Sequence, residues 1–198
     1  MSNQPTVVAA FDFDGTLTTR DTLIAFIRYT HGVHRMCLGF MRHAHLLVLM
    51  KCGLKTNEEV KQIIFSYFYK GVGYTQFCQW GESFALQSPQ WLRQRAVDLL
   101  ANHQRQGHTT CVVTASIYEW VAPICQRLGI DHVLATRVEI SQQGLLTGRF
   151  LTPNCRGKEK VHRLQEVFSD RSSYTLYVYG DSRGDRELLA YADHSVHF

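Results

Sequence analysis

The sequence predicts an α/β fold in which a parallel β-sheet is covered by helices on both faces and carries an inserted α-helical cap. Two observations predict it. Short apolar runs alternate with helix-length segments along most of the chain, a pattern typical of parallel sheets. One stretch, residues 19–87, contains helix-period runs but no convincing strand. We therefore expect a core domain formed by residues 1–18 and 88–198, and a helical cap formed by residues 19–87.

Five apolar runs are candidate strands of the core sheet. Unbroken runs of apolar residues indicate strands that are buried on both faces. Three runs lead directly into polar residues, at Asp12, Thr114 and Asp181. Because the carboxyl ends of parallel strands meet at one edge of a sheet, we expect these polar residues to lie together. The candidate strands are residues 7–11, 111–113 and 174–179, with weaker candidates at 132–135 and 194–198.

Two helices of the core have explicit start signals. Ser88 and Pro89 supply an N-cap and a proline at the first helical position, for a helix that runs to about residue 103. Ser116 and Glu119 form an S-x-x-E capping box that opens a second helix. Ser116 is therefore interpreted as a helix cap and not as a second nucleophile.

Residues 138–150, with Gln-Gly at their middle, are typical of a β-hairpin appended to the core. In the cap, Thr56 and Glu59 form another capping box. Residues 36–50 are the most apolar stretch, but they fall short of the roughly 20 apolar residues that span a bilayer. The main interpretation is a cap helix packed on its neighbours. The alternative is a helical face that leans on a membrane.

Composition limits the classes of function. With 45% hydrophobic and 19% charged residues, the chain is typical of a globular protein. A net charge of +4 suits an anionic substrate but is too scattered to indicate nucleic acid, so no nucleic-acid partner is expected. The six cysteines form no CxxC pair, which predicts buried thiols in a reducing cytoplasm. The N-terminus lacks the features of a secretory signal, and the oligomeric state is left open.

Four polar motifs follow one another in the chain. They are DFDGT at Asp12, Thr114-Ala115-Ser116, Lys158 in GKEKVHRL, and GDSRGD at Asp181. Asp12 and Asp14, two positions apart at a strand end, point to the same side and can face one ligand. An isolated DxD is usually a turn or a helix cap. Four such motifs in strand-end positions indicate instead one shared site.

This ordered set resembles the haloacid dehalogenase (HAD) superfamily, subfamily IB, in the branch around phosphoserine phosphatase, which has a Rossmann-like core and a helical cap. The resemblance covers essentially the whole chain. It implies that Asp12 is the nucleophile, Asp14 the general acid and base, Thr114 and the Ala115 amide phosphate ligands, Lys158 the catalytic and phosphate-neutralising lysine, and Asp12, Asp14 (through its carbonyl), Asp181 and Asp185 the Mg²⁺ site.

Elementary electrostatics agrees with a metal. A phosphate dianion does not bind among four carboxylates unless positive charge is supplied, and Mg²⁺ with a lysine supplies it. Asp14 favours a phosphatase over a dehalogenase, because only cleavage of a phosphate ester needs an acid there. The chain carries Gly15 where phosphoserine phosphatases tend to have serine, and it lacks the glycine pair after the residue matching Thr114. Phosphoserine itself is therefore in question as the substrate.

Three assignments have competing interpretations. Lys160 competes with Lys158 for the buried position, and the spacing in GKEKV favours Lys158. Asp185 is a direct metal ligand, an acceptor from a metal-bound water, or the cap of the helix near residue 186, and the preferred interpretation is a position behind the metal with some metal contact. Asp21 is either a specificity residue that meets the substrate or the N-cap of the helix starting at Thr22.

The leading functional hypothesis is a Mg²⁺-dependent phosphomonoesterase that acts on a small phosphorylated metabolite through an aspartyl-phosphate intermediate. The enzymatic alternative is a lipid-phosphate phosphatase of the phosphatidylglycerophosphatase type at the inner membrane surface. An alternative of another class is a catalytically silent binding or regulatory module. The complete set of acidic motifs argues against that third hypothesis.

Overall fold

The computed structural model describes residues 6–198, with the side chain at position 47 excepted. The prediction that the N-terminus lacks a secretory signal falls partly on residues 1–5, which lie outside the described residues. Five strands form one sheet in the order β3-β2-β1-β6-β7, and every neighbouring pair is parallel. This sheet confirms the predicted α/β fold. The strands are β1 (Thr6–Phe11), β2 (Thr109–Ile117), β3 (His132–Thr136), β6 (Tyr174–Gly180) and β7 (His194–His197).

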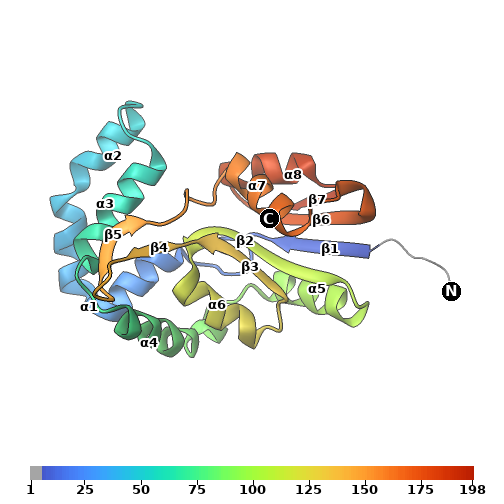
Figure 1. The fold of residues 1–198 in the computed structure, drawn as a ribbon, viewed down its shortest axis with the longest axis horizontal. Helices are drawn as coiled ribbons and strands as arrows, with labels where there is room; N and C mark the ends of the chain where they lie inside the picture. The colour runs from blue at the N-terminus through green and yellow to red at the C-terminus, as the bar shows by residue number, and fades with distance from the viewer. Residues whose placement is uncertain (1–5) are drawn as a thin grey trace.

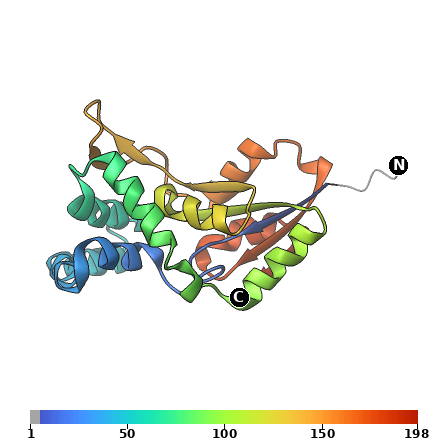
Figure 2. The same ribbon diagram turned by 90° about the horizontal axis from the view of Figure 1, so that it is seen from below.

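Helices cover both faces of the sheet, because its central strand is apolar on both sides. Val8 and Ala10 of β1 pack in one cluster with Leu164 of α7 and Leu188 of α8. The alternate residues Ala9 and Phe11 belong to a second cluster, with side chains of α5 and α6. Figures 1 and 2 show these two helical layers around the sheet. The helices are α5 (Gln94–Arg105), α6 (Tyr118–Arg127), α7 (Lys158–Val167) and α8 (Arg186–Tyr191).

A second group of helices lies at one end of the sheet (Figure 1). Its helices are α1 (Thr22–Arg42), α2 (Ala44–Lys51), α3 (Asn57–Tyr69) and α4 (Tyr74–Ala85). The predicted capping box is present, since the Thr56 side chain accepts from the Glu59 amide and the Glu59 side chain accepts from the Thr56 amide. α1 is interrupted at Gly32, where φ is 75°. These helices fall within the expected cap, and its boundaries at residues 19 and 87 stay a prediction.

The predicted hairpin consists of β4 (Val138–Ile140) and β5 (Leu146–Phe150), which pair antiparallel. It packs on the helical group: the amides of Gly71 and Leu146 bond to the carbonyls of Leu146 and Val72. The amide of Phe150 also donates to the Gln62 side chain at 2.9 Å. The hairpin therefore links the core sheet to α3.

One predicted helix boundary is wrong. Ser88–Gln90 forms a single 3₁₀ turn, and α5 begins only at Gln94. Leu92 forms an isolated antiparallel bridge with Thr18 and Arg93 is extended. The amide of Thr19 donates to the Trp91 carbonyl, and the amide of Arg93 donates to the Leu17 carbonyl. This pairing with the segment that leaves β1 competes with helix formation, and a sequence signal at Ser88–Pro89 does not reveal it.

Candidate active site

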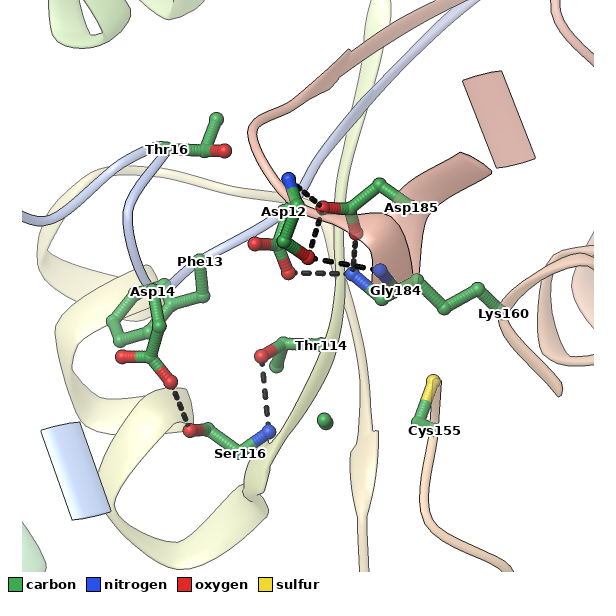
Figure 3. A network of polar contacts seen from close by, with 12 residues as sticks. Asp12, Phe13, Asp14, Thr16, Thr114, Ser116, Cys155, Lys160, Gly184 and Asp185 are labelled. Carbon is green, nitrogen blue, oxygen red and sulfur yellow. Dashed lines mark hydrogen bonds and ion pairs between the residues drawn. The ribbon is translucent and has the colours of Figure 1, made fainter. Parts of the chain in front are cut away.

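The predicted polar residues do meet at the carboxyl edge of the sheet. Asp12 follows β1, Thr114 lies in β2 and Asp181 follows β6, and all three line one cavity of about 540 Å³. The Asp12 amide donates to the Tyr179 carbonyl at 2.8 Å, which ties the end of β1 to β6. Figure 3 shows the side chains around Asp12, Lys160 and Asp185 at this edge. Parallel topology thus assembles motifs that are far apart in the chain.

Lys160 occupies the position predicted for Lys158. Its Nζ lies 2.5 Å from Asp12 Oδ1 and 2.5 Å from Asp185 Oδ1, and its side chain is 2% exposed (Figure 3). Lys158 is exposed and does not line the cavity. Two successive steps of about 100° place residues 158 and 160 on opposite sides of a helix. Lys160 shares the buried side with Leu164, one turn later, so the placement of Lys158 at the phosphate is corrected.

The buried charged groups around Asp12 include too little positive charge to compensate its carboxylate. Burial raises the pKa of Asp12 to about 7, although the Lys160 charge opposes this. Burial also opposes ionisation of Asp185, but the Lys160 charge and the Ser182 donors outweigh it and lower the pKa of Asp185. Burial disfavours the charged form of Lys160, yet the two carboxylates raise its pKa above the ordinary value. Lys160 therefore compensates one carboxylate, and a further cation would stabilise Asp12 as an anion.

Asp12, Asp181 and Asp185 each offer a carboxylate oxygen, and these oxygens lie within 4.8 Å of one another. Two glycines make room for them. A Cβ at Gly15 would lie 2.1 Å from Asp181 Oδ2, and a Cβ at Gly180 would lie 2.7 Å from the Asp185 Cβ. A cluster with only oxygen donors suits Mg²⁺. The Asp14 side chain is not in this group.

Both oxygens of Asp185 already have donors. Oδ1 accepts from Lys160, and Oδ2 accepts from the Ser182 amide at 2.9 Å and the Ser182 hydroxyl at 2.8 Å. Ser182 and Asp185 form a capping box around the 3₁₀ turn Arg183–Asp185. Asp185 is the N-cap residue of α8 by position, but its side chain makes no capping hydrogen bond to that helix, so the interpretation of this side chain as the cap of α8 is wrong. Asp185 orients Lys160 and the loop that carries Asp181.

Asp14 is held apart from the acidic group. Its Oδ1 accepts from the Thr22 amide at 2.9 Å, and its Oδ2 accepts from the Ser116 hydroxyl (Figure 3). Burial, followed by the Asp21 charge, raises the pKa of Asp14. A carboxyl group with a raised pKa, lining the same cavity as Asp12, is suited to proton transfer.

The helix-cap interpretation of Ser116 is wrong. β2 continues to Ile117, which precedes α6, and no side chain caps that helix. Ser116 instead donates to Asp14, and its amide donates to the Thr114 hydroxyl at 3.0 Å. The signal that was available is the spacing of Thr114 and Ser116, which places both on one face of the strand.

Lys61 of α3 is a site residue that the sequence analysis missed. Its Nζ donates to the Ala115 carbonyl and, at 3.2 Å, to the Asn154 side chain. Burial lowers the pKa of Lys61 to about 8, although the Asp14 and Asp21 charges oppose this. Lys61 lines the cavity together with Thr114 and Ala115. Nothing in the local sequence distinguishes it from the other cap lysines, because its partners are supplied by the core.

Comparison with known proteins identifies the family. A family model described as haloacid dehalogenase-like hydrolase matches residues 9–190. The chain belongs to this family. This haloacid dehalogenase-like hydrolase is 37% identical to Protein CicA of Caulobacter vibrioides over 194 residues, covering 98% of this chain and 86% of that protein.

Two further similarities bear on the type of hydrolase. The chain is 31% identical to a histidinol-phosphatase of Neisseria meningitidis over 97 residues, 46% of this chain and 43% of that protein. A structure of a phospho-aspartyl intermediate analogue of phosphoserine phosphatase has a TM-score of 0.63 and 19% identity, covering 98% of this chain and 87% of the other. The latter shows the shared fold. The predictions of a HAD hydrolase fold and of a phosphatase-type enzyme are confirmed.

At the mouth of the hydrolase site, Asp21 is the N-cap of α1, since its side chain accepts from the Ile24 amide at 3.1 Å. It also lines the cavity, so a second role toward substrate stays a prediction. Three arginines within residues 19–87, Arg28, Arg35 and Arg42, are not among the described residues that line the cavity. Two other arginines, at positions 20 and 156, do line it.

Proposed function

We propose that this hydrolase is a Mg²⁺-dependent phosphomonoesterase that acts on a small phosphorylated metabolite through a phosphate ester of Asp12. The observation that carries the proposal is the position of Asp12: it is buried at the cavity, paired with Lys160 at 2.5 Å and close to the carboxylate of Asp181. This arrangement offers a nucleophile next to positive charge, at a place where a phosphoryl group has room to enter.

Mg²⁺ fits the residues present. The donors are carboxylate oxygens, and the raised pKa of Asp12 indicates a group that an additional cation would stabilise as an anion. Asp12 and Asp181 would hold the ion, with Asp185 behind them. Bound there, Mg²⁺ would supply positive charge that lets an anionic substrate approach the carboxylates.

The first half of the reaction uses Asp12 and Asp14. Oδ1 of Asp12 is held by Lys160, while no described residue donates a hydrogen bond to Oδ2, which is therefore free to attack phosphorus. A bond forms between Oδ2 and phosphorus as the bond to the ester oxygen breaks. Asp14, in its protonated form, gives its proton to the departing oxygen.

The second half restores the enzyme. Asp14, now ionised, removes a proton from water; the water oxygen bonds to phosphorus and the bond to Asp12 breaks, which releases inorganic phosphate. The Thr22 amide and the Ser116 hydroxyl keep the Asp14 carboxyl oriented in both halves. Proton transfer of this kind contributes roughly 10² to 10⁴ in rate, and Lys160 stabilises charge that develops on the phosphoryl oxygens.

The proposed setting follows from the thiols. All six cysteines are free, but only Cys111, Cys125 and Cys155 are buried, while Cys37 and Cys52 are exposed, so the prediction of buried thiols holds for only part of the set. Free thiols are typical of a reducing cytoplasm, which is the setting we propose. The relative called histidinol-phosphatase supports a phosphorylated metabolite as substrate, and the site geometry does not single out one compound.

The test is to trap the phosphoenzyme. With an aryl phosphate, whose leaving group departs without protonation, Asp14→Asn should still be phosphorylated and should accumulate the intermediate, because water is no longer activated. Asp12→Asn should show no phosphorylation and background turnover. Mass spectrometry after a brief acid quench would locate one phosphoryl group on the peptide containing Asp12. A phosphoryl group on Ser116, or normal turnover of Asp12→Asn, would refute the proposal.

A further inference from the structure

The far end of the helical group carries an unusual charge. We call residues 33–55 the cap tip: it comprises the half of α1 beyond Gly32, α2 and the segment before Thr56. The cap tip contains four Lys and Arg and no Asp or Glu. The remainder of the chain holds 17 of each sign, so the cap tip accounts for the whole net charge of +4.

Those positive charges are largely uncompensated. Lys55 pairs with Glu59 at 3.2 Å. Arg35, Arg42 and Lys51 are exposed, and no carboxylate among the described residues forms an ion pair with them. The cap tip therefore presents a positive potential that would attract an anionic surface.

Apolar side chains lie among these cations. Leu38, Met41, Val48 and Leu54 are 59%, 66%, 61% and 71% exposed, which makes them four of the six most exposed large apolar side chains in the described chain. Each of these side chains would bury apolar surface that is now in contact with water if the cap tip contacted an apolar phase. Interleaved basic and apolar side chains on short helices are typical of segments that lie in a membrane interface.

The cap tip also borders the active-site cavity. Phe40, His43 and Met50 lie on its inner side and line the cavity that reaches Asp12. In Figure 1, α2 lies at the end of the molecule, beyond α3 and away from the sheet. Part of the cap tip therefore belongs to the lining of the cavity that contains Asp12.

We propose that the cap tip docks on an anionic lipid membrane. This docking does not rest on the proposed function. None of the described helices is long and apolar enough to cross a membrane, so contact is confined to the interface. A membrane is favoured over an acidic protein because the charge is of one sign and the exposed apolar side chains are spread among the cations.

Docking is tested by co-sedimentation with vesicles of phosphatidylcholine, with and without phosphatidylglycerol. The native protein should sediment with the anionic vesicles and dissociate as salt is raised. The triple variant Arg35→Gln, Arg42→Gln, Lys51→Gln should bind about 100-fold more weakly, since each basic residue near an anionic surface contributes about fivefold. Leu38→Ser with Met41→Ser should also weaken binding. The matched control is Arg105→Gln, Arg127→Gln, Arg186→Gln, which removes three exposed arginines from the core and should leave binding unchanged.

A second readout separates this proposal from the proposed function. Turnover of a soluble aryl phosphate should not change in the tip variant, because the three substituted residues are not among the described residues that line the cavity. If the native protein does not bind anionic vesicles, or if the tip variant binds them normally, the docking proposal is wrong. The cap tip would then be a contact surface for a protein partner. Native protein that sediments but has no Mg²⁺-dependent activity on the aryl phosphate would overturn the proposed function alone.

Discussion

At the scale of single residues, the site depends on one buried cation among several carboxylates. Lys160 bonds to both Asp12 and Asp185, so it holds the Asp12 carboxylate in place and compensates the charge of Asp185. Lys158 lies only two positions away but points to solvent. This pair is a natural matched comparison, because the same substitution can be made in one helix turn with and without loss of the buried charge.

We expect Lys160→Met to lower kcat on an aryl phosphate by about 10² to 10³, as for removal of other charge-stabilising groups. Lys158→Met should stay within about twofold of the native rate, because exposed substitutions are usually near neutral. Steady-state kinetics with circular dichroism as a check of folding would decide. Equal losses of kcat in both variants would show that the effect comes from a change at the start of α7 and not from the charge of Lys160.

The lowered pKa of Lys61 predicts that the stability of the folded protein depends on pH. Its pKa is lowered to about 8 from an ordinary value of 10.5. Between these values the unfolded chain keeps a proton that the folded protein has released, so stability rises with pH across this window. The free energy of unfolding of the native protein, relative to Lys61→Met, should therefore increase from pH 8 to 10.5.

Urea unfolding at both ends of that window measures the difference. Lys70→Met, at the exposed C-terminal end of the same helix, is the control for removing a lysine charge. A difference between native protein and Lys61→Met that stays flat, or that decreases with pH, would show that Lys61 is not held in a buried position.

At the scale of elements, α4 and α6 approach each other through Gly81. A Cβ at this position would lie 2.1 Å from the Glu119 carbonyl oxygen, which belongs to the backbone of α6 and cannot rotate away. The close approach lets Phe77 and Phe84 of α4 reach the aromatic cluster around Phe26. Gly81 therefore sets the spacing between a helix of the expected cap and a helix of the core.

Gly81→Ala should destabilise the protein by about 1 to 3 kcal/mol, the usual cost of overpacking a tight contact. Gly73→Ala, at the start of the same helix, is the matched control, because a Cβ there meets nothing within 4 Å and its φ of −62° suits alanine. The free energies of unfolding in urea should separate the two variants. Equal stability would mean that α4 shifts without cost.

At the scale of the whole molecule, β1, α7 and the loop after β6 are joined through a few buried charges. Asp12, Lys160 and Asp185 come from segments that are separated by 148 and 25 residues. A cation bound there would stabilise all three segments together. The folded state alone assembles this site, so binding should raise the thermal unfolding midpoint.

We expect Mg²⁺ to raise the unfolding midpoint of the native protein in a concentration-dependent way and EDTA to abolish turnover of an aryl phosphate. Asp181→Asn should lose most of the thermal shift, because it removes a carboxylate from the cluster. Thr147→Ala, which alters a polar side chain on the remote hairpin, serves as the control. Full turnover in EDTA after confirmed metal removal would contradict the metal assignment.

The sequence by itself determined the sheet, the capping box at Thr56 and the meeting of Asp12, Asp14, Thr114 and Asp181 at one cavity. These features follow from local periodicity and from the rule that parallel strands end at one edge, both of which are encoded in short segments. The family resemblance then assigned a chemical role to the residues of these motifs.

Only the tertiary structure decided which lysine is buried, what Ser116 does and that Lys61 reaches the site. Each of these depends on partners supplied by a distant segment: Asp12 for Lys160, Asp14 for Ser116 and Ala115 for Lys61. Local sequence patterns predict the role of such a residue only from its position in a helix or from its preference for helix caps. A buried hydrogen bond to a group that arrives from elsewhere in the chain outweighs that preference, because leaving a buried polar group unpaired costs about 1 to 3 kcal/mol.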